Sequence, residues 1–217
     1  MKYSGMARFM WPIYRRSFRS ALINVLGYNR ISADRIMCCA KERYRSIIGK
    51  LPEFEKDDIF KTNILSCSML IAVLQSLDKR PKLLDTSEYY KQAMTNAATK
   101  AFCRMGSKQK FKDRDIKKMK KTAAIRAADR NPYSWNMDYL PYEDGSGYEA
   151  RFYKCGICTL MKEYGYFDLT PAMCALDYTM SDMGGSTVFV REYTLASGGP
   201  YCDCGYKKKD RSMKNYQ

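Results

Sequence analysis

The hydrophobic pattern of the chain changes at Asn131-Pro132, and this change constrains the fold more than any other feature. Before it, apolar residues recur at three- and four-residue spacing, which predicts amphipathic helices. After it, glycine-rich turns separate stretches of β-branched and aromatic residues, which predict short strands. We therefore predict an α+β fold, in which a helical half packs on a small antiparallel sheet with short helices.

Four or five helices are expected in the first part of the chain. Apolar spacing predicts them over residues 7–26, 33–51, 58–74, 86–105 and 113–129. Ser32 and Thr86 are the expected N-caps of two of them, and Asp57 or Asp58 is the expected start of the third. Pro52 is expected to end the second helix, because proline cannot continue it.

The remaining residues are predicted to alternate between strands and short helices. The expected strands cover 148–154, 186–194 and 201–206, and the expected helices cover 155–164 and 170–183. Residues 207–217 form a basic tail in this interpretation. With 217 residues, the chain is expected to be one domain, with a helical part over about 1–130 and a cysteine-rich part over about 131–206.

Lysine and arginine number 38 against 23 acidic residues, which makes the protein basic, with a net charge of +15. The lysines of 108–121 fall on all sides of the predicted helix, which indicates general solvation rather than a binding stripe. No helix-turn-helix, zinc-finger or RNA-recognition signature is present. A nucleic-acid-associated protein therefore remains the third alternative, and a specific nucleic-acid partner is not expected.

Histidine is absent from the sequence, which excludes the Ser-His-Asp and Cys-His arrangements. No apolar stretch reaches the roughly 18–20 residues that a bilayer-spanning helix needs. We therefore expect no membrane association and a cytoplasmic protein. The nine cysteines would then lie in a reducing compartment, where structural disulfides are rare.

Five of the nine cysteines fall between residues 155 and 204, on three predicted elements. Cys155 precedes a helix, Cys174 and Asp177 share a helix face, and Cys202 lies on a strand. These elements could present thiols and a carboxylate to one small volume. The cysteines of the helical half are instead expected to fill the core, and these are Cys38, Cys39, Cys67 and Cys103.

The order of motifs in this region carries a resemblance to a known family. Cys155 stands before a helix that ends at Gly165, a Cys174-x-x-Asp177 helix follows, and a Leu-x-x-Gly-Gly-x-x-Cys-Asp stretch ends at Asp203. This pattern, over residues 155–203, resembles the L-2-amino-thiazoline-4-carboxylic acid hydrolase family. The family usually has an aromatic residue after the final Cys-Asp, where this chain has Cys204.

The resemblance implies a hydrolase acting on non-peptide C–N bonds, with a small carboxylated cyclic amidine as substrate. Its reaction would open a thiazoline ring to a carbamoyl-cysteine. Cys174, Asp177 and Cys202 are the expected catalytic residues. The expected substrate-binding residues are Arg191, Gly198, Gly199 and Asp203, with Arg191 chosen because its guanidinium matches a carboxylate.

Three mechanisms fit these residues. A thiolate of Cys174 or Cys202 could attack while Asp177 manages protons, or Asp177 could activate a water molecule while the cysteines line the site. In the third mechanism, Cys155, Cys174 and Cys202 hold a zinc ion that polarises the water; otherwise no cofactor is expected.

A different class of protein also fits. Small cysteine-bearing modules of the 4-vinyl reductase-like kind bind small molecules or metals without catalysis, and they need only a closed, satisfied site. A hydrolase needs Asp177 near a pocket that solvent can reach. If Asp177 is buried it requires a partner, such as Arg191 or a backbone N–H group. Gly198-Gly199 could also be simply a turn, and Cys174 simply part of the core.

Overall fold

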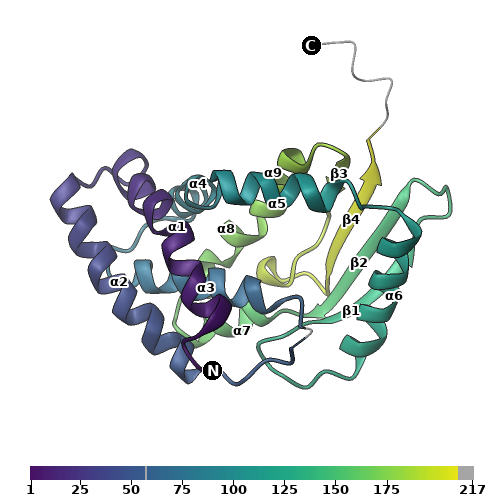
Figure 1. Ribbon diagram of the computed structural model, residues 1–217, viewed down its shortest axis with the longest axis horizontal. Helices are drawn as coiled ribbons and strands as arrows, with labels where there is room; N and C mark the ends of the chain where they lie inside the picture. Colours follow the sequence, from purple (N-terminus) through teal and green to yellow (C-terminus); the bar gives the residue numbers. More distant parts are fainter. Residues whose placement is uncertain (57, 210–217) are drawn as a thin grey trace, which may run out of the picture.

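The computed structural model describes residues 1–56 and 58–209, and Figure 1 shows a helical part beside a small sheet. This arrangement confirms the predicted α+β fold. The helices are α1 (Gly5–Asn24), α2 (Arg30–Lys50), α3 (Lys61–Leu74), α4 (Leu83–Met94), α5 (Ala97–Ser107), α6 (Asp113–Ala127), α7 (Gly156–Glu163), α8 (Thr170–Cys174) and α9 (Leu176–Gly184). The strands are β1 (Asn136–Pro141), β2 (Gly147–Lys154), β3 (Thr187–Val190) and β4 (Cys202–Lys208).

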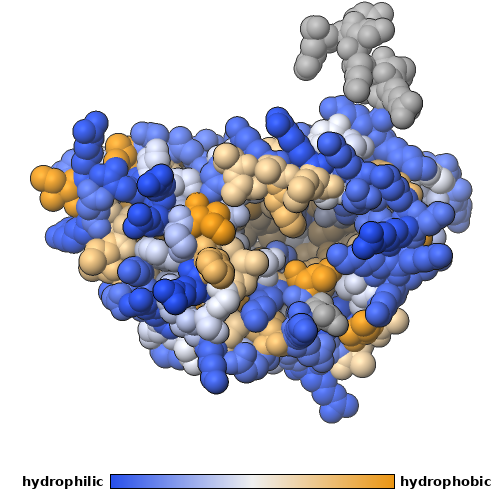
Figure 2. Space-filling view, viewed as in Figure 1, coloured by the Kyte–Doolittle hydropathy of each residue, from blue (hydrophilic) through white to orange (hydrophobic). Residues whose placement is uncertain are grey.

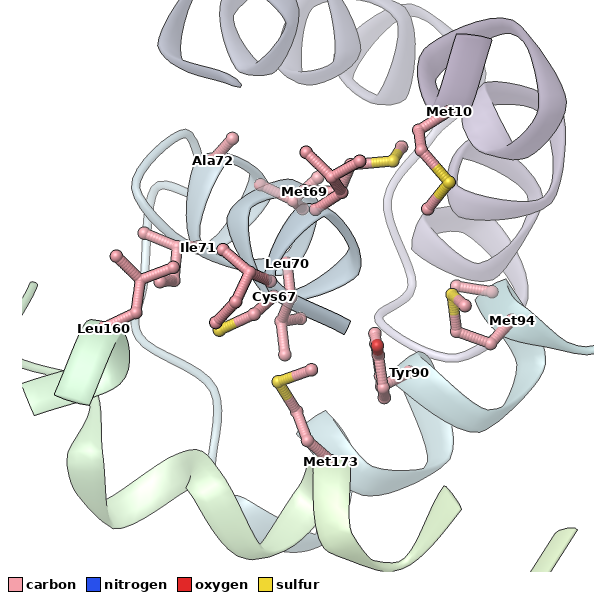
Figure 3. Packing of buried hydrophobic residues seen from close by; sticks show 14 of the residues in the cluster. Met10, Cys67, Met69, Leu70, Ile71, Ala72, Tyr90, Met94, Leu160 and Met173 are labelled. Atoms are coloured by element: carbon pink, nitrogen blue, oxygen red, sulfur yellow. The ribbon is translucent and has the colours of Figure 1, made fainter. Parts of the chain in front are cut away.

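Helix α3 is the centre of the hydrophobic core. Every side chain from residue 64 to residue 74 is buried, which is typical of a helix that other elements surround. Figure 3 shows Met10 of α1, Tyr90 of α4, Leu160 of α7 and Met173 of α8 around it. The first part of the chain and the cysteine-rich part therefore pack on the same helix.

Two helix starts differ from the sequence prediction, one because another side chain provides the cap and one because the helix begins a turn earlier without a side-chain cap. The side chain of Asn29 accepts a hydrogen bond from the backbone N–H of Ser32 at 2.8 Å, so Asn29 rather than Ser32 caps α2. Helix α4 begins at Leu83, upstream of the expected cap Thr86. The Thr86 hydroxyl donates instead to the carbonyl of Lys82 at 2.8 Å, within the first turn.

The helix predicted over residues 86–105 is two helices. It breaks at Thr95, whose ψ of 72° is not helical. The side chain of Asn96 then accepts from the N–H of Thr99 at 2.9 Å and starts α5. Because of this break α5 takes its own direction, and it forms one wall of the cleft described below.

Other element bounds also differ from the prediction. Strand β1 was not anticipated, β3 ends at Val190 rather than at 194, and the helix predicted over 170–183 is divided into α8 and α9. Helix α3 begins at Lys61 rather than at Asp58, whose buried carboxylate accepts from the N–H of Phe60 at 2.8 Å; Asp57 lies outside the described part. Strand β4 continues to Lys208, so the predicted tail begins inside the sheet, while residues 210–217 lie outside the described part.

The sheet is antiparallel with the strand order β1-β2-β4-β3. Across β2 and β4, Ala150 pairs with Cys204 and Tyr148 pairs with Tyr206. On the other side of β4, Phe189 of β3 also pairs with Tyr206. These side chains share the face that packs against helices, with α9 against β3 and α6 against β1.

Within residues 1–56 and 58–209, we find no helix with the length and apolar character needed to cross a membrane.

Candidate active site

Asp177 and Arg191 form an ion pair where α9 meets the sheet. Arg191 follows β3, and its Nη1 donates to Asp177 Oδ2 at 2.7 Å. Its Nη2 donates to the carbonyl oxygen of Cys174 at 2.6 Å, and Nη1 lies 3.9 Å from Cys204 Sγ. The structure thus contains the partner that the sequence required for Asp177. With a side chain only 6% exposed, Arg191 is engaged by the protein itself.

A cleft of about 740 Å³ lies between α5, α6 and α9, with Tyr206 of β4 in its lining. Figure 2 shows it as a hollow near the centre of the molecular face, with hydrophobic side chains on one side and hydrophilic side chains over α6 on the other. Its apolar lining includes Ile59, Phe102 and Met119, and its charged lining includes Lys110, Arg114, Lys118, Asp115 and Asp177. This size suits a small-molecule site.

Three catalytic residues were predicted, Cys174, Asp177 and Cys202. Of these, Asp177 lines the cleft. Its side chain keeps 40% of its surface exposed toward the cleft, and the protein covers the rest. Burial raises the pKa of Asp177 above the ordinary aspartate value, although Arg191 opposes this shift by favouring the carboxylate. The Oδ1 atom has no hydrogen bond to any residue in the described part of the chain, so it can face a ligand.

Lys110 and Tyr206 are cleft residues that the sequence did not single out. Lys110 belongs to the lysine-rich stretch expected to be solvated, but its Nζ donates to the hydroxyl oxygen of Tyr148 at 2.8 Å. It also lies 3.9 Å from the centre of the Tyr206 ring. The sequence did contain a signal for Tyr206. It lies two residues after Cys204 on the same strand, and alternate residues of a strand share a face, which places Tyr206 on the same side as Cys204.

The three thiols of the predicted site come from three elements. Cys155 precedes α7, Cys174 ends α8 and Cys202 begins β4. The thiols of Cys155 and Cys202 both lie near enough to raise the pKa of Cys174. The Cys202 sulfur accepts a hydrogen bond from the N–H of Leu195 at 3.2 Å. The elements therefore gather the thiols behind the ion pair, and the cleft is lined by other residues.

Burial keeps these thiols protonated at neutral pH. It raises the pKa of Cys174 to about 12 and that of Cys202 to about 11, even though Arg191 favours both thiolates. Burial also raises the pKa of Cys204, while the Cys158 thiol and burial together raise that of Cys155. The thiolate, rather than the thiol, is the nucleophile of a cysteine. This geometry therefore favours attack by water over attack by cysteine.

We expect Cys174 and Cys202 to be alkylated slowly by iodoacetamide at pH 7, with a rate that rises about tenfold per pH unit up to pH 10. Cys38 and Cys39 should react first, because both are exposed. The prediction that these two cysteines fill the core was therefore wrong, while Cys67 and Cys103 are buried as predicted. Peptide mass spectrometry after timed alkylation measures each rate. Rapid alkylation of Cys174 at pH 7 would restore the thiolate mechanism.

Gly198, Gly199 and Asp203 shape the connection between β3 and β4. The carboxylate of Asp203 accepts from the N–H groups of Glu192 at 2.8 Å and Tyr193 at 2.6 Å. Gly198 has a φ of 82°, which favours glycine, and Gly199 donates its N–H to the carbonyl of Thr194 at 2.8 Å. The contacts of these three residues are those of a structured turn.

The structure offers no ligand set for the zinc alternative. Among residues 1–56 and 58–209, no three cysteine, aspartate or glutamate side chains come together as a group that could hold a metal ion. Cys155, Cys174 and Cys202 are neighbours without forming such a group.

Comparison with known proteins adds one match. The model of the family described as L-2-amino-thiazoline-4-carboxylic acid hydrolase matches residues 62–206, about two thirds of the chain. The matched region includes Asp177, Arg191 and the gathered thiols. No curated protein and no solved structure matches the chain.

Proposed function

The chain belongs to the L-2-amino-thiazoline-4-carboxylic acid hydrolase family, and from that premise we propose that it opens the ring of a small carboxylated cyclic amidine. The observation that carries the proposal is the placement of Asp177. Its carboxylate is fixed through Oδ2 by Arg191, while the side chain stays 40% exposed toward a cleft that solvent can reach. A fixed acceptor beside an open cavity suits general-base catalysis.

In the proposed reaction, Asp177 accepts a proton from a water molecule as the water oxygen attacks the ring carbon between nitrogen and sulfur. The carbon–sulfur bond then breaks: the second proton of the water molecule passes to the ring nitrogen, and the sulfur leaves with the proton returned by Asp177. The ring carbon becomes the carbonyl of a urea group, so that thiazoline plus water gives carbamoyl-cysteine. Arg191 acts as a positioning residue, because it holds the carboxylate and prevents its rotation.

The raised pKa values of the thiols support water rather than cysteine as the nucleophile. A raised pKa of Asp177 also makes its carboxylate a stronger base than an ordinary aspartate. The cysteines then provide an apolar support behind the ion pair. The open cleft at Asp177 favours hydrolysis over a binding module, which would need only a closed site.

The direct test is turnover of L-2-amino-thiazoline-4-carboxylate by the purified full chain in water labelled with heavy oxygen. We expect carbamoyl-cysteine with one labelled oxygen in its urea carbonyl and one new free thiol per ring opened. Mass spectrometry and a thiol reagent measure the two products. Saturable binding of the ring without turnover would contradict the proposal and support the binding module.

A further inference from the structure

The ammonium of Lys110 is held inside the cleft by two tyrosines. Lys110 lies between α5 and α6, and its Nζ donates to the hydroxyl oxygen of Tyr148 at 2.8 Å. The same nitrogen lies 3.9 Å from the ring centre of Tyr206 and 5.2 Å from that of Tyr148. An aromatic face attracts a cation through its quadrupole, so these contacts fix where the charge lies.

The backbone next to Lys110 is strained in a way that maintains this position. Phe111 has a φ of 65°, in the left-handed region that non-glycine residues rarely occupy. Its N–H donates to Asp115 Oδ2 at 3.0 Å, and its ring centre lies 5.7 Å from that of Tyr148. Such strain persists only where neighbouring contacts enforce it, and here they turn the chain so that Lys110 reaches the cleft.

Lys110 has no direct ion-pair partner in the described part of the chain, and the Asp115 carboxylate acts on its charge only from a longer distance. No carboxylate of residues 1–56 and 58–209 lies within ion-pair distance of its Nζ, and the bond to Tyr148 is its one hydrogen bond to those residues. The nearest candidate, Asp115, uses Oδ2 to accept from the hydroxyl of Tyr148 at 3.1 Å and from Phe111. Two of the three ammonium N–H groups are therefore available to a ligand.

The other cations near the cleft are less suited to bind an anion there. Arg191 already serves Asp177 and Cys174, and it does not line the cleft. Arg114 and Lys118 line the cleft but are exposed on α6, where water and salt weaken their attraction. Lys110 is half-buried, so an anion beside it would be screened less, and the anion would offset the cost of burying the charge.

We propose that Lys110 determines the specificity of the cleft by binding the carboxylate of the substrate. This inference rests on the proposed function, since Asp177 and Lys110 line the same cleft and would act on two ends of one molecule. The carboxylate accepts the two available N–H groups of Lys110, and the ring extends toward Asp177. Arg191, the expected carboxylate partner, keeps its positioning role instead.

The test compares two probes, L-2-amino-thiazoline-4-carboxylate and 2-amino-thiazoline, which lacks the carboxylate. Their Kd values are measured by calorimetry, and KM and kcat by thiol release, for the wild type, Lys110→Met, Lys110→Arg and Lys117→Met. Lys117 is a matched control because it is exposed on α6 and does not line the cleft. Circular dichroism establishes that each variant is folded.

We expect Lys110→Met to raise Kd and KM for the carboxylate about 10- to 100-fold, which is the usual effect of losing a charge-assisted hydrogen bond. Binding of 2-amino-thiazoline should change less than about twofold, and Lys110→Arg should recover part of the loss. An equal loss for both probes, or the same loss in Lys117→Met, would overturn the inference. Preferential binding of the carboxylate through Lys110 without turnover would refute only the proposed function.

Discussion

Replacing Asp177 with asparagine should lower kcat/KM for ring opening by about 10²- to 10⁴-fold, the usual contribution of a positioned general base. Asparagine keeps an oxygen that accepts from Arg191 Nη1 but cannot take a proton from water. The fold should therefore survive while the chemistry is lost. Steady-state kinetics with L-2-amino-thiazoline-4-carboxylate measures the effect, and thermal unfolding checks the fold.

Asp182→Asn is the matched control, because Asp182 lies on α9 like Asp177 but is exposed and outside the cleft lining. Its kcat/KM should stay within about twofold of the wild type. If Asp177→Asn retained more than about a tenth of the wild-type rate, Asp177 would not be the base. The attack would then have to be assigned to another group in the cleft.

The pH profile of the wild type provides a second measurement of the same role. As the pH falls through the pKa of Asp177, the carboxylate becomes protonated and can no longer activate water. Because burial raises this pKa, the acid limb of kcat/KM should lie above the ordinary aspartate value of about 3.9. An acid limb at or below that value would contradict the assignment.

The division of the chain into helical and cysteine-rich parts could be predicted because apolar spacing reports local structure. The break between α4 and α5 could not be predicted from spacing, since Ala93, Ala97 and Ala101 continue the helical pattern across it. In the structure Ala101 is exposed and Cys103 is buried, because α5 turns a different face toward α9. The one local signal was Asn96, a residue type typical of an N-cap.

The candidate site was predictable to the extent that it depends on local motifs. A buried aspartate requires a partner, and this requirement pointed to the pair of Asp177 with Arg191. The cleft is different, because α5, α6 and α9 form it only through their tertiary packing. Lys110 was therefore indistinguishable from its solvated neighbours in the sequence, and only its contacts with Tyr148 and Tyr206 set it apart.

A buried charge cluster anchors the end of α6 and thereby supports one wall of the cleft. The guanidinium of Arg126, 3% exposed, contacts Asp58, whose side chain is 1% exposed, at 3.0 Å. It also pairs with Asp129, and with Glu55 at 2.6 Å. The hydroxyl of Ser134 donates to the same oxygen of Asp58 at 2.7 Å. The cluster therefore ties α6 to the segment before α3 and to the turn before β1.

Replacing Arg126 with methionine should lower the free energy of unfolding by about 3–5 kcal/mol, because it leaves the carboxylate of Asp58 buried without its cation. Urea unfolding at pH 7 measures the change.

The control is Arg35→Met, since Arg35 is 65% exposed and pairs with Asp78 at 3.4 Å on the surface. Such a surface pair contributes at most about 1 kcal/mol to the free energy of unfolding. Adding Asp58→Asn to Arg126→Met should recover part of the loss, because it removes the unpaired charge. Equal destabilisation by the two arginine variants, or no recovery in the double variant, would show that α6 is held in place by packing rather than by this cluster.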